Sequence, residues 1–177
     1  MRLMRYHTIV VRRAPGRPSE GRLILPEGVR RAALGRSGIK ALKREGDGAT
    51  PLGRFAIREV LYRADRAPRP RTGLPCRAIR KDDGWSDDPY DRNYNRHIRL
   101  PSRRSAEGLM RADNLYDLII VLGYNYRPRV KGNGSAIFTH LVRPGYTPTE
   151  GCIALSRRDM HALLHRLRPG TTIEIKR

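Results

Sequence analysis

The sequence has no long hydrophobic segment. Its longest uninterrupted apolar run is the five residues Leu118–Leu122, whereas a membrane helix needs about 20 residues and the core of a secretory signal about 7 to 15. We therefore expect neither a transmembrane helix nor a signal peptide.

Cysteine is also scarce. Cys76 and Cys152 are the only two and form no C-x-x-C pair, which excludes a disulfide-rich scaffold and leaves a single bridge open.

Acidic residues are few relative to basic ones. The 177 residues include 17 Asp and Glu against 37 Lys and Arg, a net charge of +20. A basic module that binds nucleic acid or another polyanion without catalysis is therefore one candidate function. However, the basic residues are dispersed, aromatic residues make up only 6%, and no helix-turn-helix, zinc-finger or RNP pattern is present. We expect non-specific adsorption to anionic polymers and no specific nucleic-acid partner.

The hydrophobic pattern predicts a mainly β fold. Residues 1–177 are expected to form one domain, because a chain of this length buries a core without disulfides or a metal. Short β-forming segments alternate with Gly and Pro, which favours a sandwich or barrel. These segments are Tyr6–Val11, Arg22–Leu25, Arg54–Tyr62, Leu115–Tyr124, Ser135–Val142, Cys152–Leu155 and Thr171–Lys176.

Turn signals lie between several of these segments. Asn133-Gly134 predicts a tight turn joining a strand over Tyr124–Val130 to the strand that starts at Ser135. Residues 63–95 are rich in Pro, Arg and Asp and are expected to form one long loop.

One amphipathic helix is expected near the C-terminus. Ser156 is a suitable N-cap, and apolar residues recur at helical spacing from Met160 to Leu167, before Pro169. His161 and His165 stand four residues apart on this helix, as zinc-binding pairs do. A zinc protease would have Glu where the chain has Ala162, so we favour a polar stripe.

Two other segments resemble ligand sites only superficially. The aspartates within Asp82–Asp91 do not follow the order of a calcium-binding EF-hand loop, so we expect them to order the loop as arginine partners. The glycine-rich segment Glu45–Gly53 lacks Gly-Lys-Ser/Thr and opens no helix. It therefore predicts a turn before a strand and no nucleotide site.

Cys152 and His140 are the candidates for covalent chemistry. Cys152 follows Gly151 at the start of a predicted strand, and His140 ends the preceding one. A hairpin between them would place the imidazole beside the thiol, where it could make a thiolate available. Gly151 permits a tight turn whose N–H groups could face a reacting oxygen. The residues alone leave open that Cys152 is an inert buried thiol.

Several segments together resemble the YkuD-type L,D-transpeptidase catalytic domain, the ErfK/YbiS/YcfS/YnhG group. The resemblance starts at residue 33 and extends nearly to the end of the chain. It rests on Ala33–Arg36, Lys43–Phe55, Gly84–Pro89, Tyr94–Arg96, Leu115–Asp117, Gly123–Asn125, His140 and Thr149–Leu155.

The resemblance implies a β-rich thiol acyltransferase of peptidoglycan with no metal or organic cofactor. Cys152 would attack the carbonyl of the third residue of a stem tetrapeptide, release D-Ala and pass the acyl group to an amine of another stem, giving a 3-3 cross-link. His140 would move the protons, oriented by the backbone carbonyl of Leu141. The N–H of Gly151 would bind the oxyanion.

The chain departs from the family pattern beside the nucleophile. Glu150 and Ala154 replace the usual residues, and Ala154 stands where the family has an Arg. A carboxylate at Glu150 would raise the pKa of the thiol. We expect Arg143, or next Arg157, to bind a substrate carboxylate instead.

Acceptor and location stay open at this stage. Water as the acceptor would make the protein an L,D-carboxypeptidase, and a free D-amino acid would give exchange. The substrate implies the periplasm or cell envelope, although the absence of a visible signal leaves a cytoplasmic location open. For an active nucleophile we expect both thiols to be free.

Overall fold

A computed structural model describes residues 6–177, so residues 1–5 of the expected domain lie outside the described part. Strands account for most of the regular structure. In chain order the elements are β1 (Thr8–Ala14), β2 (Arg17–Leu25), β3 (Gly28–Ala33), β4 (Ile39–Lys40), β5 (Thr50–Pro51), β6 (Gly53–Tyr62), β7 (Cys76–Ala78), β8 (Asp83–Ser86), β9 (His97–Arg99), β10 (Ala106–Gly108), β11 (Leu118–Leu122), β12 (Phe138–Leu141), η1 (Pro144–Tyr146), β13 (Ile153–Leu155), α1 (Arg157–Leu164) and β14 (Thr172–Lys176).

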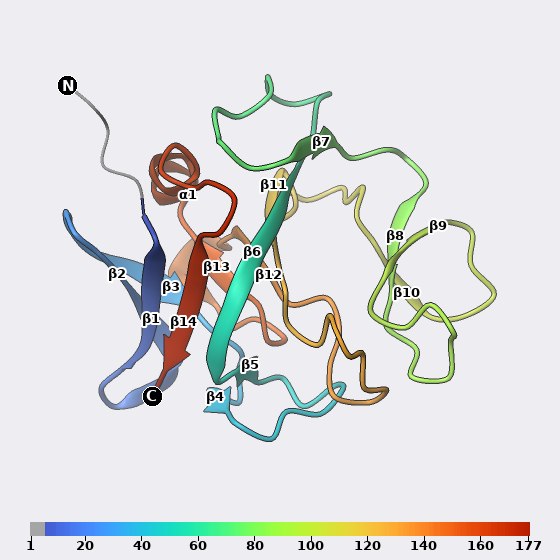
Figure 1. The fold of residues 1–177 in the computed structure, drawn as a ribbon, viewed down its shortest axis with the longest axis horizontal. Coiled ribbons are helices and arrows are strands. Elements are labelled where there is room, and N and C mark those ends of the chain that lie inside the picture. Colours follow the sequence, from blue (N-terminus) through green and yellow to red (C-terminus); the bar gives the residue numbers. More distant parts are fainter. Residues whose placement is uncertain (1–5) are drawn as a thin grey trace.

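The main sheet closes on itself. Its strand order is β11-β12-β13-β3-β2-β1-β14-β6-β7, and β6 also pairs with β11, which closes a barrel and leaves β7 as a branch. Figure 1 shows β14 between β1 and β6, with α1 at one end of the barrel. Apolar side chains from most of these strands form the core, among them Ile9, Leu23, Val60, Ile120, Ile153 and Ile173. The predicted mainly β fold is thus confirmed.

All seven predicted strand segments overlap an observed strand. The C-terminal helix is present too, with the hydroxyl of Ser156 accepting the N–H of Asp159 at its start. No helix within residues 6–177 is long and apolar enough to span a membrane.

The strand predicted over residues 124–130 is wrong. β11 and β12 are antiparallel neighbours, but the connection between them is a long loop instead of a tight turn. Asn125 holds this loop in shape, because its side chain donates to the carbonyls of Val130 and Gly134, both at 2.9 Å. Pro128 has no N–H for a sheet ladder, which also disfavours a strand here.

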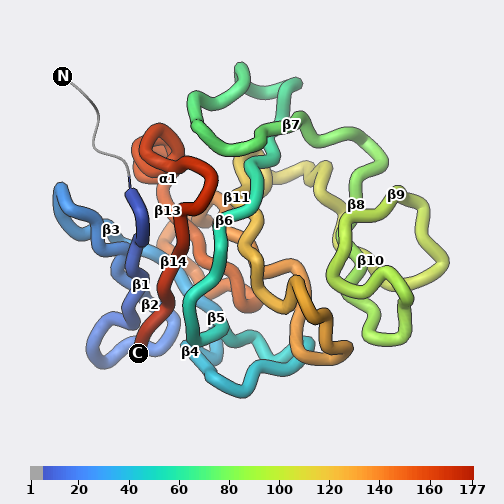
Figure 2. Tube along the Cα trace, in the orientation of Figure 1, coloured from blue at the N-terminus to red at the C-terminus, as the bar shows by residue number. Residues whose placement is uncertain are grey.

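The long loop expected over residues 63–95 carries structure of its own. It contains β7 and β8, and β8 forms a small sheet with β9 and β10 in the order β10-β8-β9. Figure 2 shows this segment and the following residues, coloured green to yellow, on one side of the barrel. The ring of Trp85 in β8 packs edge-on against Phe138 in β12, with centroids 5.1 Å apart. The small sheet is therefore joined to the barrel through an aromatic core.

Arginine–aspartate pairs order the small sheet, as the sequence predicts. Asp83 is fully buried and contacts Arg77 at 2.6 Å and His97 at 2.8 Å. Hydrogen bonds from the backbone and these partners outweigh burial and hold the pKa of Asp83 at about 2. Asp88 pairs with Arg104 at 3.4 Å.

Candidate active site

His140 and Cys152 lie on neighbouring strands. His140 is in β12 and Cys152 directly precedes β13. These strands run parallel, with His140 opposite Ala154, so the prediction of a hairpin between them is wrong. Residues 142–152 cross back to the start of β12, as a parallel pair requires. Because side chains two residues apart share a face, Cys152 and Ala154 lie on the face that bears His140.

Both side chains line one cavity of about 520 Å³. Its walls come from β12 and the loop before it, from the crossover to β13, and from residues next to and within the small sheet. Six charged residues line it: Glu45, Asp87, Glu107, Arg111, Arg143 and Glu150.

The thiol of Cys152 is held in place by the backbone. Its Sγ lies 3.2 Å from the carbonyl oxygen of Ala136, to which it donates, and accepts the N–H of Phe138 at 3.3 Å. Burial, and after it the charge of Glu107, raises the pKa of Cys152 to about 12. The Cys152 side chain at rest is therefore a neutral thiol.

The imidazole of His140 is oriented by the next residue. Its Nδ1 lies 2.8 Å from the carbonyl oxygen of Leu141. A carbonyl only accepts, so Nδ1 carries the proton and Nε2 is left as the basic nitrogen. Burial lowers the pKa of His140 to about 4. The resting pair is thus thiol and neutral imidazole, not thiolate and imidazolium.

The turn before Cys152 is closely packed. Gly151 has φ +134°, and a Cβ there would lie 2.7 Å from the carbonyl oxygen of Ala49. The hydroxyl of Thr149 accepts the Gly151 N–H at 3.2 Å and donates to the Cys152 carbonyl at 2.6 Å. The glycine is required by both backbone conformation and space, and its N–H has a long hydrogen bond in the resting state.

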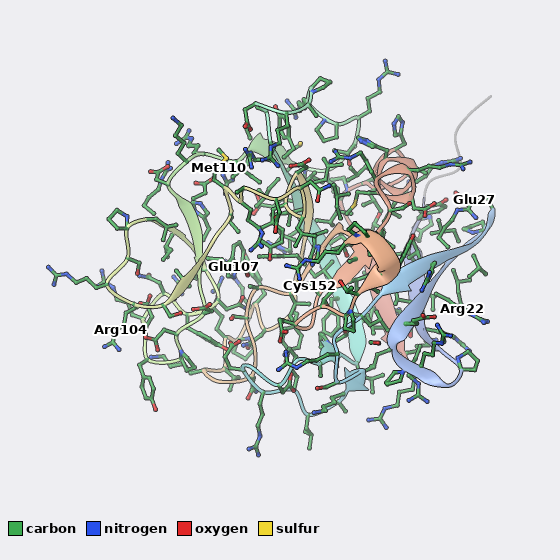
Figure 3. The ribbon with its side chains drawn as sticks, turned by 180° about the vertical axis from the view of Figure 1, so that it is seen from behind. Arg22, Glu27, Arg104, Glu107, Met110 and Cys152 are labelled. Carbon is green, nitrogen blue, oxygen red and sulfur yellow. The ribbon has the colours of Figure 1, made fainter. Side chains whose placement is uncertain are left out.

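Tyr116 and Glu107 form a pair that the sequence does not reveal. The Tyr116 hydroxyl donates to Glu107 at 2.5 Å, and its ring packs edge-on against His140 with centroids 5.4 Å apart. Glu107 comes from β10 of the small sheet, far from Cys152 in sequence, and Figure 3 shows it on the side of that sheet toward Cys152. Only the motif Leu115–Asp117 points to Tyr116, and it assigns no role.

Asn95 braces the backbone that accepts the thiol. It is 4% exposed, and its Oδ1 accepts the N–H of Ala136 at 3.1 Å and the indole N–H of Trp85 at 2.9 Å. Ala136 has φ +50°, a strained conformation for a residue with a Cβ. Asn95 therefore connects the small sheet to the carbonyl that holds Cys152.

The structure separates the remaining predicted residues. Arg143 lines the cavity, but Arg157 does not and instead pairs with Asp117 at 2.5 Å. Glu150 lines the rim, where its exposed side chain pairs with Arg36. The carboxylate that raises the pKa of the thiol is Glu107, so the expectation placed on Glu150 is wrong.

Cys76 and Cys152 are both free thiols. No group of three or more His, Cys, Asp or Glu side chains within residues 6–177 is placed to hold a metal ion. His161 lies in the last turn of α1 and His165 caps it.

Comparison with known protein families agrees with this geometry. The model of the YkuD family, described as the L,D-transpeptidase catalytic domain, matches residues 9–175. Searches of curated proteins and of solved structures gave no match.

Proposed function

Since the chain belongs to the YkuD family of L,D-transpeptidase catalytic domains, we propose that it is a cysteine-dependent acyltransferase acting on peptidoglycan stem peptides in the cell envelope. The observation that carries this proposal is the shared cavity of Cys152 and His140, with Nδ1 of the imidazole held by a carbonyl and Nε2 left basic. A thiol nucleophile needs a base of this kind in the same cavity, which supports the proposal.

The first half-reaction forms a thioester. His140 Nε2 takes the thiol proton while Sγ attacks the carbonyl carbon of the third stem residue. The tetrahedral intermediate collapses as the C–N bond to D-Ala breaks, and the imidazolium returns its proton to the leaving amine. Because both groups rest neutral, proton transfer accompanies the attack.

Backbone groups near Gly151 are suited to the oxyanion. The Gly151 N–H makes only a 3.2 Å bond to Thr149 at rest, and a negatively charged oxygen is a stronger acceptor that would displace it. One such donor typically contributes about 3 to 4 kcal/mol to the transition state. Arg143, which lines the cavity from the crossover, would bind a stem carboxylate.

The second half-reaction transfers the acyl group to an amine of another stem. Water in place of the amine would give carboxypeptidase activity.

The test is to incubate wild-type protein and Cys152→Ala with a purified disaccharide-tetrapeptide, following intact mass and released D-Ala. We expect a thioester adduct and D-Ala release that require Cys152, and the ratio of dimer to tripeptide identifies the acceptor. D-Ala release by Cys152→Ala at the wild-type rate would overturn the proposal.

A second function, adsorption to anionic polymers, is favoured by an arginine cluster. The guanidiniums of Arg58, Arg129 and Arg127 lie 4.2, 4.7 and 5.6 Å from the centre of the Tyr126 ring. None of the three pairs with a carboxylate among the described residues. A linear fall of log affinity for a polyanion with log salt concentration would show an electrostatic contact, and sequence preference at about 200 mM salt would indicate specific nucleic-acid binding.

A further inference from the structure

The catalytic cavity holds acidic side chains that lack a cationic partner. Most acidic residues of this arginine-rich chain form ion pairs. Asp88, next to Asp87 in sequence, pairs with Arg104, and Asp113 pairs with Arg111. Glu45, Asp87 and Glu107 form none with residues 6–177, and all three line the cavity. In a chain with 37 basic residues, three carboxylates that line one cavity without forming an ion pair point to a cationic ligand.

Unpartnered polar atoms occur at the same place. Asp87 Oδ1 and Ser135 Oγ are buried without a hydrogen-bond partner, and both residues line the cavity. Ser135 is only 7% exposed. The nearby Tyr94 hydroxyl donates to Glu45 and accepts the Gly134 N–H, and the Ser135 hydroxyl approaches it closely enough to act on the pKa of Tyr94. Even with its proton directed at Tyr94, Ser135 Oγ would keep its lone pairs for a donor in the cavity. Buried polar atoms of this kind normally have a partner, and a donor entering the cavity would supply one.

The charges that face Glu107 favour a bound cation. Burial raises the pKa of Glu107, and the charges of Asp87 and Glu45 raise it further. The Tyr116 hydrogen bond and the Arg111 charge act in the opposite direction, but Arg111 is engaged with Asp113 at 2.6 and 2.8 Å.

The other cations near the cavity are placed less favourably. Lys43 is held by Asp47 at 2.8 Å, and Arg143 is exposed on the crossover. The carboxylates are not grouped as metal ligands within the described residues, which favours an organic cation over a divalent metal.

We propose that Asp87, Glu107 and Ser135, with Glu45 behind them, form an ammonium-binding subsite beside Cys152. An ammonium has three N–H donors, which suits the two unpartnered oxygens and the Glu107 carboxylate. This inference rests on the proposed acyl transfer and specifies what the site takes: a stem residue that carries a side-chain amine.

The subsite is consistent with the chemistry of transfer. The bound ammonium loses a proton, and the amine attacks the thioester carbon. A C–N bond forms and the C–S bond breaks, while His140 takes the second proton from the attacking nitrogen and delivers it to the sulfur. In sum, an ammonium and a thioester give an amide, a thiol and one proton, which passes to solvent.

Two ammonium groups could occupy the subsite: that of the donor residue attacked by Cys152 and that of the acceptor. The test compares wild type, Asp87→Asn and Glu107→Gln, with Asp88→Asn as control, because Asp88 is adjacent in sequence but pairs with Arg104 outside the cavity. Donors carry a free or an acetylated side-chain amine, and diaminopimelate serves as acceptor.

If the acceptor binds here, the KM for diaminopimelate rises about tenfold or more in both cavity variants, while D-Ala release by Asp87→Asn changes less than about threefold. If the donor binds here, D-Ala release falls instead, and acetylation of the donor amine reproduces the loss in wild type. Asp88→Asn behaves as wild type in either case. Unchanged KM and unchanged D-Ala release in both cavity variants would overturn the subsite and leave the acyltransferase proposal intact.

A binding measurement separates this inference from catalysis. Cys152→Ala protein is titrated with Nα-acetyl-lysine amide and with its Nα,Nε-diacetyl analogue by calorimetry. We expect the cationic compound to bind at least about tenfold more tightly, and Asp87→Asn to abolish the difference. Equal affinity for the two compounds would refute the subsite, even if wild type released no D-Ala and the proposed function had failed.

Discussion

Replacing Asn95 with alanine is expected to destabilise the protein. It should also reduce D-Ala release by disturbing the position of the Cys152 thiol, although Asn95 does not line the cavity. The Asn95 side chain accepts the N–H groups of Trp85 and Ala136 and donates to the carbonyls of Tyr124 and Asn125, at 2.9 to 3.1 Å. The change leaves four backbone or indole groups without their partner in a site where the asparagine is 4% exposed.

The magnitude follows from these bonds. Each buried group left unsatisfied costs about 1 to 3 kcal/mol, and a water entering the vacated space would recover some of that. Asn95 also has φ +55°, which alanine tolerates less well, at a further cost of about 1 kcal/mol. We expect a total loss of about 3 to 5 kcal/mol. With a urea m-value of about 2 kcal/mol/M, the unfolding midpoint falls by about 1.5 to 2.5 M.

Urea unfolding monitored by Trp85 fluorescence measures the stability change, and D-Ala release measures the nucleophile. Without urea, where the variant is folded, D-Ala release should fall at least about tenfold, because Asn95 no longer holds the Ala136 backbone whose carbonyl accepts the Cys152 thiol. Asn93→Ala, in the same loop, is the control and should stay within about 0.5 kcal/mol of wild type. A loss below about 1 kcal/mol for Asn95→Ala would refute the reasoning.

Three further predictions concern the turn, the thiol and a buried carboxylate. Gly151→Ala should lose at least about 2 kcal/mol and most D-Ala release, because its Cβ meets a backbone oxygen at 2.7 Å; Gly132→Ala, at φ +81° with open space, should lose only about 1 kcal/mol in the same urea assay. Alkylation of Cys152, followed by peptide mapping, should rise about tenfold per pH unit from pH 6 to 9, since its pKa of about 12 leaves the thiolate fraction still growing; a plateau near pH 7 would contradict the neutral pair. Folding depresses the pKa of Asp83, so its contribution of about 2 kcal/mol to the free energy of unfolding is present above pH 4 and lost as pH falls toward 2. Asp83→Asn should therefore lose less stability than wild type between pH 4 and 2. Curves of stability against pH that run parallel for the two proteins would contradict this role of Asp83.

The fold is predictable where the sequence pattern is strong. The apolar run Leu118–Leu122 and the capped helix after Ser156 declare themselves locally. β3 does not, because Gly28–Ala33 contains two arginines and three small residues, and its strand is imposed by pairing with β2 and β13. The parallel pairing of β12 and β13 is likewise a property of the closed barrel, and no local pattern distinguishes it from a hairpin.

The candidate site divides in the same way. Cys152, Gly151 and His140 stand within 13 residues of one another, so motif and resemblance find them. Asp87 and Glu107 are separated from Cys152 by 65 and 45 positions. Asp87 lies in the segment Gly84–Pro89, which assigns it no role, and Glu107 lies in none of the motifs. Their place beside the thiol depends on how the small sheet docks, through Trp85 against Phe138. The sequence suggests Glu150 as the carboxylate that raises the pKa of the thiol, because it is close to Cys152 in the chain. In the structure, Glu107 is the carboxylate that does so.

This division assigns different work to the two parts of the fold. The barrel supplies the thiol, the imidazole and the turn, which are held by backbone hydrogen bonds. The small sheet and the residues flanking it supply Asp87, Glu107 and the Asn95 brace. Substitution of Asp87 should therefore change which amine is used while leaving the thioester step in place, whereas substitution of Glu107 should also lower the pKa of the thiol. Substitutions at Trp85 or Asn95, which join the small sheet to the barrel, should weaken thioester formation and acyl transfer together. They displace both the small sheet that forms the cavity wall and the thiol of Cys152.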